Sequence, residues 1–223
     1  MIHFNWGQLF LGDEAHLFSA LIAFIVVILF VVFGRLALKS TMEPAKTPSF
    51  KALIELFTSF IIGLSDSVIG PPGRKMVPIF GAIFLIIWLQ NLFTLIPGFS
   101  AATDNLNSTF AFGVCAFGLY NFYGIKHHKW AYIRQFLGPI WAIAPFFLFL
   151  EIISHIMRPI SLGLRLYGNM TGDHAILSTF VDLVPIVVPV IFYFLGLFVC
   201  TMQAFVFTML TMIYFSMAIS EDH

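Results

Sequence analysis

Long apolar stretches separated by short polar segments make up most of the chain, and they predict an all-α integral membrane protein. Residues 15–34 contain no Asp, Glu, Lys or Arg, and a helix of that length crosses a hydrocarbon core about 30 Å thick. Residues 76–100 and 105–125 are predicted as a second and a third span, with a polar, turn-forming linker between them. No strand pattern or internal repeat stands out, so the prediction is a single membrane domain over residues 1–223.

Residues 50–70 have a different pattern, in which apolar side chains recur at helical spacing on one stripe. Lys51, Glu55 and Asp66 lie mainly off that stripe. Such a pattern is typical of an amphipathic helix that lies on a membrane surface. Pro71 and Pro72 follow and are expected to end it.

The last two apolar segments, 136–183 and 185–220, are too long for upright spans. As straight helices each would measure more than about 50 Å at 1.5 Å per residue, well over the thickness of the hydrocarbon core. We expect two long, oblique helices that pack as an antiparallel hairpin turning near residue 184. The fold prediction is therefore about five membrane helices plus one surface helix.

Composition and charge support this class and give an orientation. The chain is 60% hydrophobic and only 10% charged, with zero formal net charge, whereas soluble domains carry about 25% charged residues. Nucleic acid is therefore not expected as a partner. Of the 11 Lys and Arg residues, all but Arg158 and Arg165 fall in residues 35–75 and 126–134. The excess of positive charge on inner loops places the N-terminus outside and the C-terminus in the cytoplasm.

Arg165 is the most informative residue, because it lies within the apolar segment 136–183. A guanidinium does not lose its proton at working pH, and at membrane depth it costs at least about 2.5–3.5 kcal/mol. It therefore needs water or a counter-charge. Asp173 is eight residues further on, about 12 Å along a helix, so the counter-charge is expected elsewhere in the fold or on another protein.

Polar residues follow one stripe of the helix that carries Arg165. Glu151, Ser161 and Asn169 fall within about 40° of it at 100° per residue, whereas His174 falls on the back. The simpler alternative is a polar face that binds neighbouring helices. In the hairpin, Gln203 is expected at the depth of Arg165, where its carbonyl could orient the guanidinium.

Titratable residues are expected on both sides of Arg165. Asp173, His174 and Asp182 lie towards the outer turn, and Glu151 lies on the inner side. This arrangement suits two aqueous paths that both reach a carboxylate on a partner but never join. A fixed cation between them blocks a direct proton leak and favours the ionised form of that carboxylate, which releases its proton.

Three motifs resemble subunit a of the rotary F-type ATP synthases. They are SLGLRLYGNM at 161–170, followed by Gly-Asp-His at 172–174, then QAFVFTMLTMIYFSMA at 203–218 and NLFTLIPG at 91–98. The resemblance implies a bacterial inner membrane, a ring of c subunits, peripheral-stalk b subunits and the lipid bilayer as partners. No metal, cofactor or catalytic residue is implied, and the chain is not expected to be an enzyme on its own.

The resemblance also implies individual roles for residues. Arg165 would face the ring carboxylate with Gln203 beside it, Glu151 would line the inner half-channel, and Asn169 and His174 would line the outer one. The chain departs from many members at Gly196, where they carry His or Glu, and at Thr94, where many bacterial members carry Asp. Asp173, Asp182 and Tyr193 are the candidates to replace the missing groups.

Two other functions fit the same composition. A stand-alone proton-coupled transporter would usually contain inverted repeats and broken helices in both halves, and neither is visible. A redox or structural anchor subunit could use His155 and His174 as haem ligands, but the two lie on one segment without evident partners on others.

Overall fold

The computed structural model describes residues 21–22, 24–29, 32, 50–95, 103, 105–128, 144–183 and 187–219 of the 223-residue chain. Nearly all of them are helical, and no strand occurs in these ranges, which confirms the all-α prediction. The elements, in chain order, are α3 (Phe50–Val68), the short 3₁₀ helix η2 (Pro71–Met76), α4 (Val77–Thr94), α5 (Leu106–His128), α7 (Ala144–Leu183) and α8 (Val187–Ile219).

The helix bounds can be set beside the sequence predictions. The surface helix 50–70 corresponds to α3, and the spans 76–100 and 105–125 correspond to α4 and α5. The hairpin segments 136–183 and 185–220 correspond to α7 and α8. Residues 96–100 and 136–143 lie outside the described ranges, as does most of the first predicted span, 15–34.

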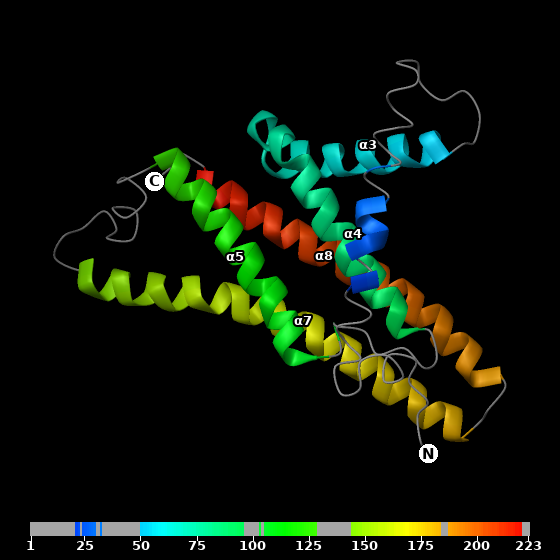
Figure 1. The fold of residues 1–223 in the computed structure, drawn as a ribbon. Helices are drawn as coiled ribbons and strands as arrows, with labels where there is room; N and C mark the ends of the chain where they lie inside the picture. The colour runs from blue at the N-terminus through cyan, green and yellow to red at the C-terminus, as the bar shows by residue number, and fades with distance from the viewer. Residues whose placement is uncertain are drawn as a thin grey trace.

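Two described stretches are long and apolar enough to cross a membrane by length and composition, Pro71–Phe93 and Val190–Ile219. The second half of α7 and the first half of α8 run side by side in opposite directions (Figure 1). Phe180 and Phe192 stack near the turn, with ring centroids 4.4 Å apart. The oblique antiparallel hairpin predicted from the sequence is therefore present.

The core lies where α4, α5, α7 and α8 meet beneath α3. Leu166, Phe207 and Met212 are almost completely buried there, and the rings of Phe80 and Phe215 meet edge to face at 5.6 Å. Because lipid tails are as apolar as these side chains, the core of a membrane protein is stabilised by close van der Waals packing between its helices and not by removal of apolar surface from water. Figure 1 shows α3 lying across the ends of the other helices instead of running beside them.

Polar contacts between backbone and side chains fix the register of α4 on α8. The Asn91 Nδ2 donates to the Cys200 carbonyl at 3.4 Å, and the Cys200 Sγ donates to the Asn91 carbonyl at 3.3 Å. One turn away, the Trp88 Nε1 donates to the Thr201 Oγ1 at 3.1 Å. A slip of one residue would break all three bonds, so the end of α4 is held at one height beside α8.

The corner between α3 and η2 is built from close contacts. Gly70 has a φ of 81°, which favours glycine, and a Cβ on Gly73 would lie 2.5 Å from the Ser65 Oγ. Arg74 binds Asp66 through two nitrogens, at 3.0 and 2.8 Å. This hydrogen-bonded guanidinium holds the pKa of the Asp66 carboxyl below its usual range. The corner therefore sets the direction of α3.

Candidate functional site

Arg165 lies on the side of α7 that faces away from the other helices. Its neighbours Leu162 and Leu166 point inward and are 3% and 0% exposed, whereas Leu164 and Arg165 are exposed. The alternation follows from the helical period, which turns residues 162 and 166 to the same face. Within the described ranges, no hydrogen bond or ion pair joins the Arg165 guanidinium to another side chain. Its charge is therefore presented outward.

Gln203 is 4% exposed, and its Oε1 accepts a hydrogen bond of 2.6 Å from the Asn169 Nδ2. The expected contact of this carbonyl with Arg165 is not the one that forms. The midpoint in sequence between residues 169 and 203 is 186, whereas the expected turn near 184 would have paired residue 203 with residue 165. That difference moves the level of Gln203 from Arg165 to Asn169, one turn nearer the hairpin turn.

The Gln203 amide has a second, unsatisfied group. Its Nε2 is buried and has no hydrogen-bond acceptor among the described residues. A buried donor without an acceptor is costly, by about 1–3 kcal/mol. The amide thus places one unsatisfied donor inside the helix pair, one turn from Arg165.

A cavity of about 40 Å³ lies between the end of α4, the last turns of α7 and the first turns of α8. It is large enough to hold water, since a single water needs at least roughly 10–15 Å³. Asp173 and His174 supply its polar groups, and the Asp173 Oδ2 is buried without a hydrogen-bond partner in the described part. The remaining lining residues are Leu95, Ile176, Leu177, Phe192, Leu195 and Gly196.

Gly196 explains where this chain departs from the expected pattern. A Cβ at this position would lie 2.8 Å from the Leu95 Cδ2, and both residues line the cavity. The space next to residue 196 is therefore taken by a leucine of the α4 end. The titratable groups of the cavity come from α7 instead, as Asp173 and His174.

A second polar cluster lies on the first half of α7. The Arg158 Nη2 lies 3.9 Å from the Glu151 Oε1, and its guanidinium lies over the Tyr214 ring at 5.4 Å, a cation–π distance. Glu151 is exposed, whereas Arg158 is partly buried. The charge of Glu151 is therefore matched by Arg158 and not by Arg165.

His155 connects this cluster to α5. Its Nε2 lies 2.9 Å from the Asn121 Oδ1, and the Asn121 Nδ2 donates to the Phe117 carbonyl at 2.9 Å. Because the amide nitrogen is the donor in the second bond, the Oδ1 is the acceptor in the first. The His155 Nε2 must therefore carry a hydrogen in this bond.

The structure thus divides the predicted residues into groups. Asn169 and Gln203 are in contact, Asp173 and His174 share the cavity, and Glu151 lies apart with Arg158. Ser161 is exposed one turn before Arg165. Asp182 belongs to α7, but its side chain lies outside the described part.

Sequence reasoning places Arg158 on the polar stripe of Arg165 but does not count it as a site residue, and it does not single out Asn121 or Tyr214. Arg158 had a visible signal, a second intramembrane arginine two turns before Arg165. Asn121 and Tyr214 had none, because their contacts depend on how α5 and α8 cross α7.

Comparison with known proteins gives a consistent result. A family model described as ATP synthase A chain matches residues 17–216. The ATP synthase subunit a of Bdellovibrio bacteriovorus is 45% identical and aligns over 99% of both chains. The subunit a of a Sulfurihydrogenibium species is 37% identical over 93% of this chain and 98% of its own. That of Trichlorobacter lovleyi is 37% identical over 89% and 85%.

Proposed function

The chain belongs to the ATP synthase A chain family, and from that premise we propose how its intramembrane residues carry protons. It acts as a non-catalytic, integral membrane subunit of an ATP synthase, in proton transport for ATP synthesis. The proposal concerns the finer level: two half-channels that lead to a ring of c subunits and are separated by Arg165.

The observation that carries the proposal is the outward guanidinium of Arg165, which has no acidic partner among the described residues. The chain contains two arginines in α7, and only Arg158 has an acidic partner in the described ranges. A cation at membrane depth is too costly to remain unmatched. The counter-charge is a carboxylate on the ring, which passes Arg165 during rotation and is held ionised there.

The outer half-channel begins at the cavity with Asp173 and His174. Its waters hand protons towards Asn169 and Gln203, one turn from Arg165, and from there to the ring carboxylate. Asp182 lies further towards the turn and belongs to the same side by position. The depth order of these residues along α7 supports the route.

The inner half-channel lies on the opposite side of Arg165, and Glu151 is its acidic group. Ser161 lies between Glu151 and Arg165 on the exposed face. Protons released from the ring leave along this side. Each charge that crosses gains about 2.3 kcal/mol per 100 mV of membrane potential.

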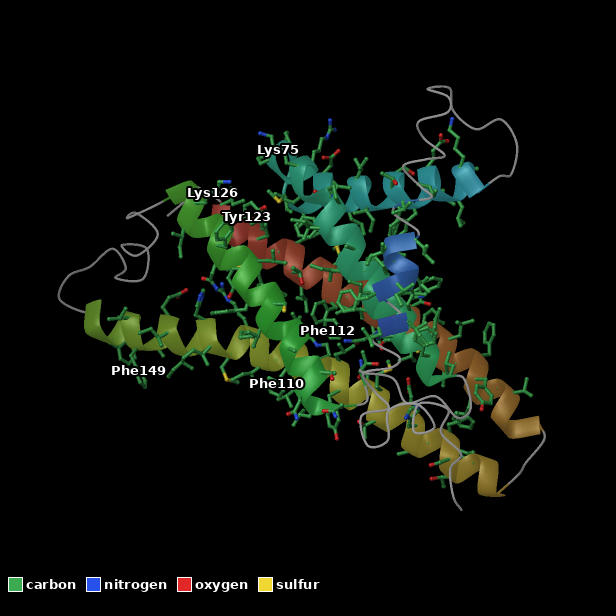
Figure 2. All side chains as sticks on the ribbon, viewed as in Figure 1. Lys75, Phe110, Phe112, Tyr123, Lys126 and Phe149 are labelled. Atoms are coloured by element: carbon green, nitrogen blue, oxygen red, sulfur yellow. The ribbon has the colours of Figure 1, made fainter. Side chains whose placement is uncertain are left out.

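The position of basic residues supports an orientation. Lys75 and Lys126 lie at the same end of the helix bundle in Figure 2, and the cavity lies beyond the opposite end of α4, at Leu95. Positive residues favour the cytoplasmic side. The cavity therefore faces outside and the C-terminus faces the cytoplasm. The bacterial relatives support a bacterial inner membrane, and membership of an ATP synthase supports peripheral-stalk b subunits as further partners.

The test is Arg165→Ala in the complete complex, with ATP-driven proton pumping measured in inverted membrane vesicles. Pumping should fall to background while the subunit still assembles with the ring, because no fixed cation then separates the two paths. Arg74→Ala is the matched control, since it removes an exposed arginine of the α3 corner, and it should pump normally. Pumping at the normal rate by the Arg165 variant would refute the proposal.

A further inference from the structure

α5 and α7 touch backbone to backbone where they cross, and two glycines make this possible. A Cβ on Gly113 would lie 2.6 Å from the Pro159 carbonyl oxygen, and one on Gly163 would lie 3.2 Å from the Phe110 Cα. Small residues allow such close approach between membrane helices. Because the opposing atoms belong to the backbone, no side-chain rotation can relieve the clash that a methyl group would create.

The contact falls on a weak point of α7. Pro159 lies inside this helix, and it has no N–H to donate to the carbonyl four residues earlier, which bends or kinks a helix. Figure 1 shows the first half of α7 leaving the bundle and the second half running beside α8. Phe149, on the first half, lies far from the side chains of the other helices in Figure 2. A bend of this kind needs external contacts to fix its angle.

α5 provides contacts on both sides of the bend. Before it, His155 is bound to Asn121 at 2.9 Å. After it, Leu162 and Leu166 are buried, and Gly163 meets the backbone of α5. Arg165 comes two residues after Gly163, on the opposite side of the helix.

We propose that Gly113 and Gly163 are positioning residues for Arg165. Their backbone contact sets the angle of the bent helix and, with it, how far the guanidinium projects from the chain towards its partner. This inference rests on the proposed function, because the partner whose distance matters is the ring carboxylate.

The physical effect of a methyl group at residue 113 follows directly. A 2.6 Å approach to a carbonyl oxygen is not tolerated, so α7 must move away from α5 by several tenths of an ångström, and Arg165 moves with it. Misplacement of a functional group by about 1 Å can cost on the order of 100-fold in rate. We expect Gly113→Ala to lower ATP synthesis by roughly ten-fold.

The matched control is Gly118→Ala. Gly118 lies on the same helix, and a Cβ there would have no atom within 4 Å. Both substitutions replace a helical glycine by alanine and raise helix propensity alike, so they differ only in the contact with α7. Gly118→Ala should leave synthesis unchanged.

The experiment uses the whole complex in liposomes, with ATP synthesis driven by an imposed proton gradient and potential. The rate of ATP synthesis is measured while the pH on the side where protons leave is varied. The rate of each variant is divided by the rate of Gly118→Ala at the same pH, which removes the pH dependence of the catalytic sector. A displaced Arg165 holds the ring carboxylate ionised less well, so release needs a higher pH. The half-maximal pH should rise by up to about one unit.

A role in folding alone would lower the rate by the same factor at every pH. An unmoved half-maximal pH in assembled Gly113→Ala complexes, or an unchanged rate, would therefore overturn the inference. If Gly113→Ala does not accumulate, the half-maximal pH of Gly163→Ala is measured instead. A Cβ on Gly163 would lie 3.2 Å from the nearest α5 atom, so this variant should disturb the packing less. Failure of the proposed function is seen separately, as normal pumping by Arg165→Ala.

Discussion

Arg158 and Arg165 lie two turns apart on the same helix, yet their surroundings differ. Arg158 has a carboxylate at 3.9 Å and an aromatic ring at 5.4 Å, so its charge is largely accounted for within the chain. Arg165 has neither within the described residues. This difference distinguishes a structural cation from one that is available to a partner. The positions of the two arginines in the sequence do not reveal it.

The role of a residue could be predicted from the sequence where it depends on local chemistry, and not where it depends on how the helices pack. The importance of Arg165 follows from the cost of a permanent charge in an apolar segment, which needs no structure. The partner of Gln203 could not be predicted to better than one turn, because an error of two residues in the hairpin turn moves the facing residue by four. Asn121 gave no signal at all, since only the crossing of α5 and α7 brings it to His155.

The bond between Asn169 and Gln203 predicts a non-additive pair of substitutions. Asn169→Leu alone leaves the buried Gln203 amide without its partner, at a cost of about 1–3 kcal/mol, and should lower the temperature at which the complex loses proton pumping. Gln203→Leu leaves only the exposed Asn169 amide, which water can satisfy, and should lower that temperature less. The double variant should lose less than the sum of the two, because residues in contact couple. Strict additivity in thermal inactivation curves would contradict the bond.

At the scale of elements, α7 is the helix whose shape matters most. Its length was predictable from the apolar run, and a proline inside a helix favours a bend, but the sequence does not show which glycine of α5 meets it. Gly113 and Gly118 are both glycines of one helix, and only Gly113 faces another backbone. The register between helices, which decides this, depends on many side-chain contacts at once.

The corner between α3 and η2 gives a prediction about pH. The pKa of Asp66 is lowered by Arg74, so the ion pair is fully formed above the ordinary carboxyl pKa and is lost only as pH falls through the lowered value. Changes between pH 6 and 8 should therefore leave the corner intact, whereas Asp66→Asn should loosen it at neutral pH.

Trypsin cleavage after Arg74 in inside-out vesicles measures this. Asp66→Asn should be cut about twofold faster than the unaltered chain, a modest change because exposed ion pairs contribute little. Ser67→Ala, which removes only a hydroxyl bonded to the Leu64 carbonyl, is the control. Equal cleavage of all three chains would mean that the ion pair does not hold the corner.

At the scale of the whole molecule, the exposed surface of α7 and α8 is mostly apolar around one cation. Leu164, Phe194 and Phe198 are among the exposed residues, as expected for a surface that lipid or other membrane helices cover. The class of fold and the hairpin could be predicted from hydrophobic pattern and length. The cavity could not, because the end of α4 that completes it lies far in sequence from the two hairpin helices.

This surface predicts that the chain does not conduct protons by itself. Reconstituted alone in liposomes, it should give no proton flux above that of empty liposomes under an imposed potential, because the two half-channels that we propose are connected only through a carboxylate of the ring. Reconstituted with the ring, it should conduct, and Arg165→Ala should change that flux. Flux through the purified chain alone would favour the stand-alone transporter instead.

Leu95 and Gly196 together limit how this subunit can be recombined with its relatives. Rotation of the leucine could make room for a single methyl group at residue 196, but the histidine or glutamate that many members carry there would fill the small water-sized space itself. We therefore expect a chimaera that imports only the last helix from such a relative to block the proposed outer proton route. The end of α4 and the two hairpin helices must therefore be exchanged as one unit.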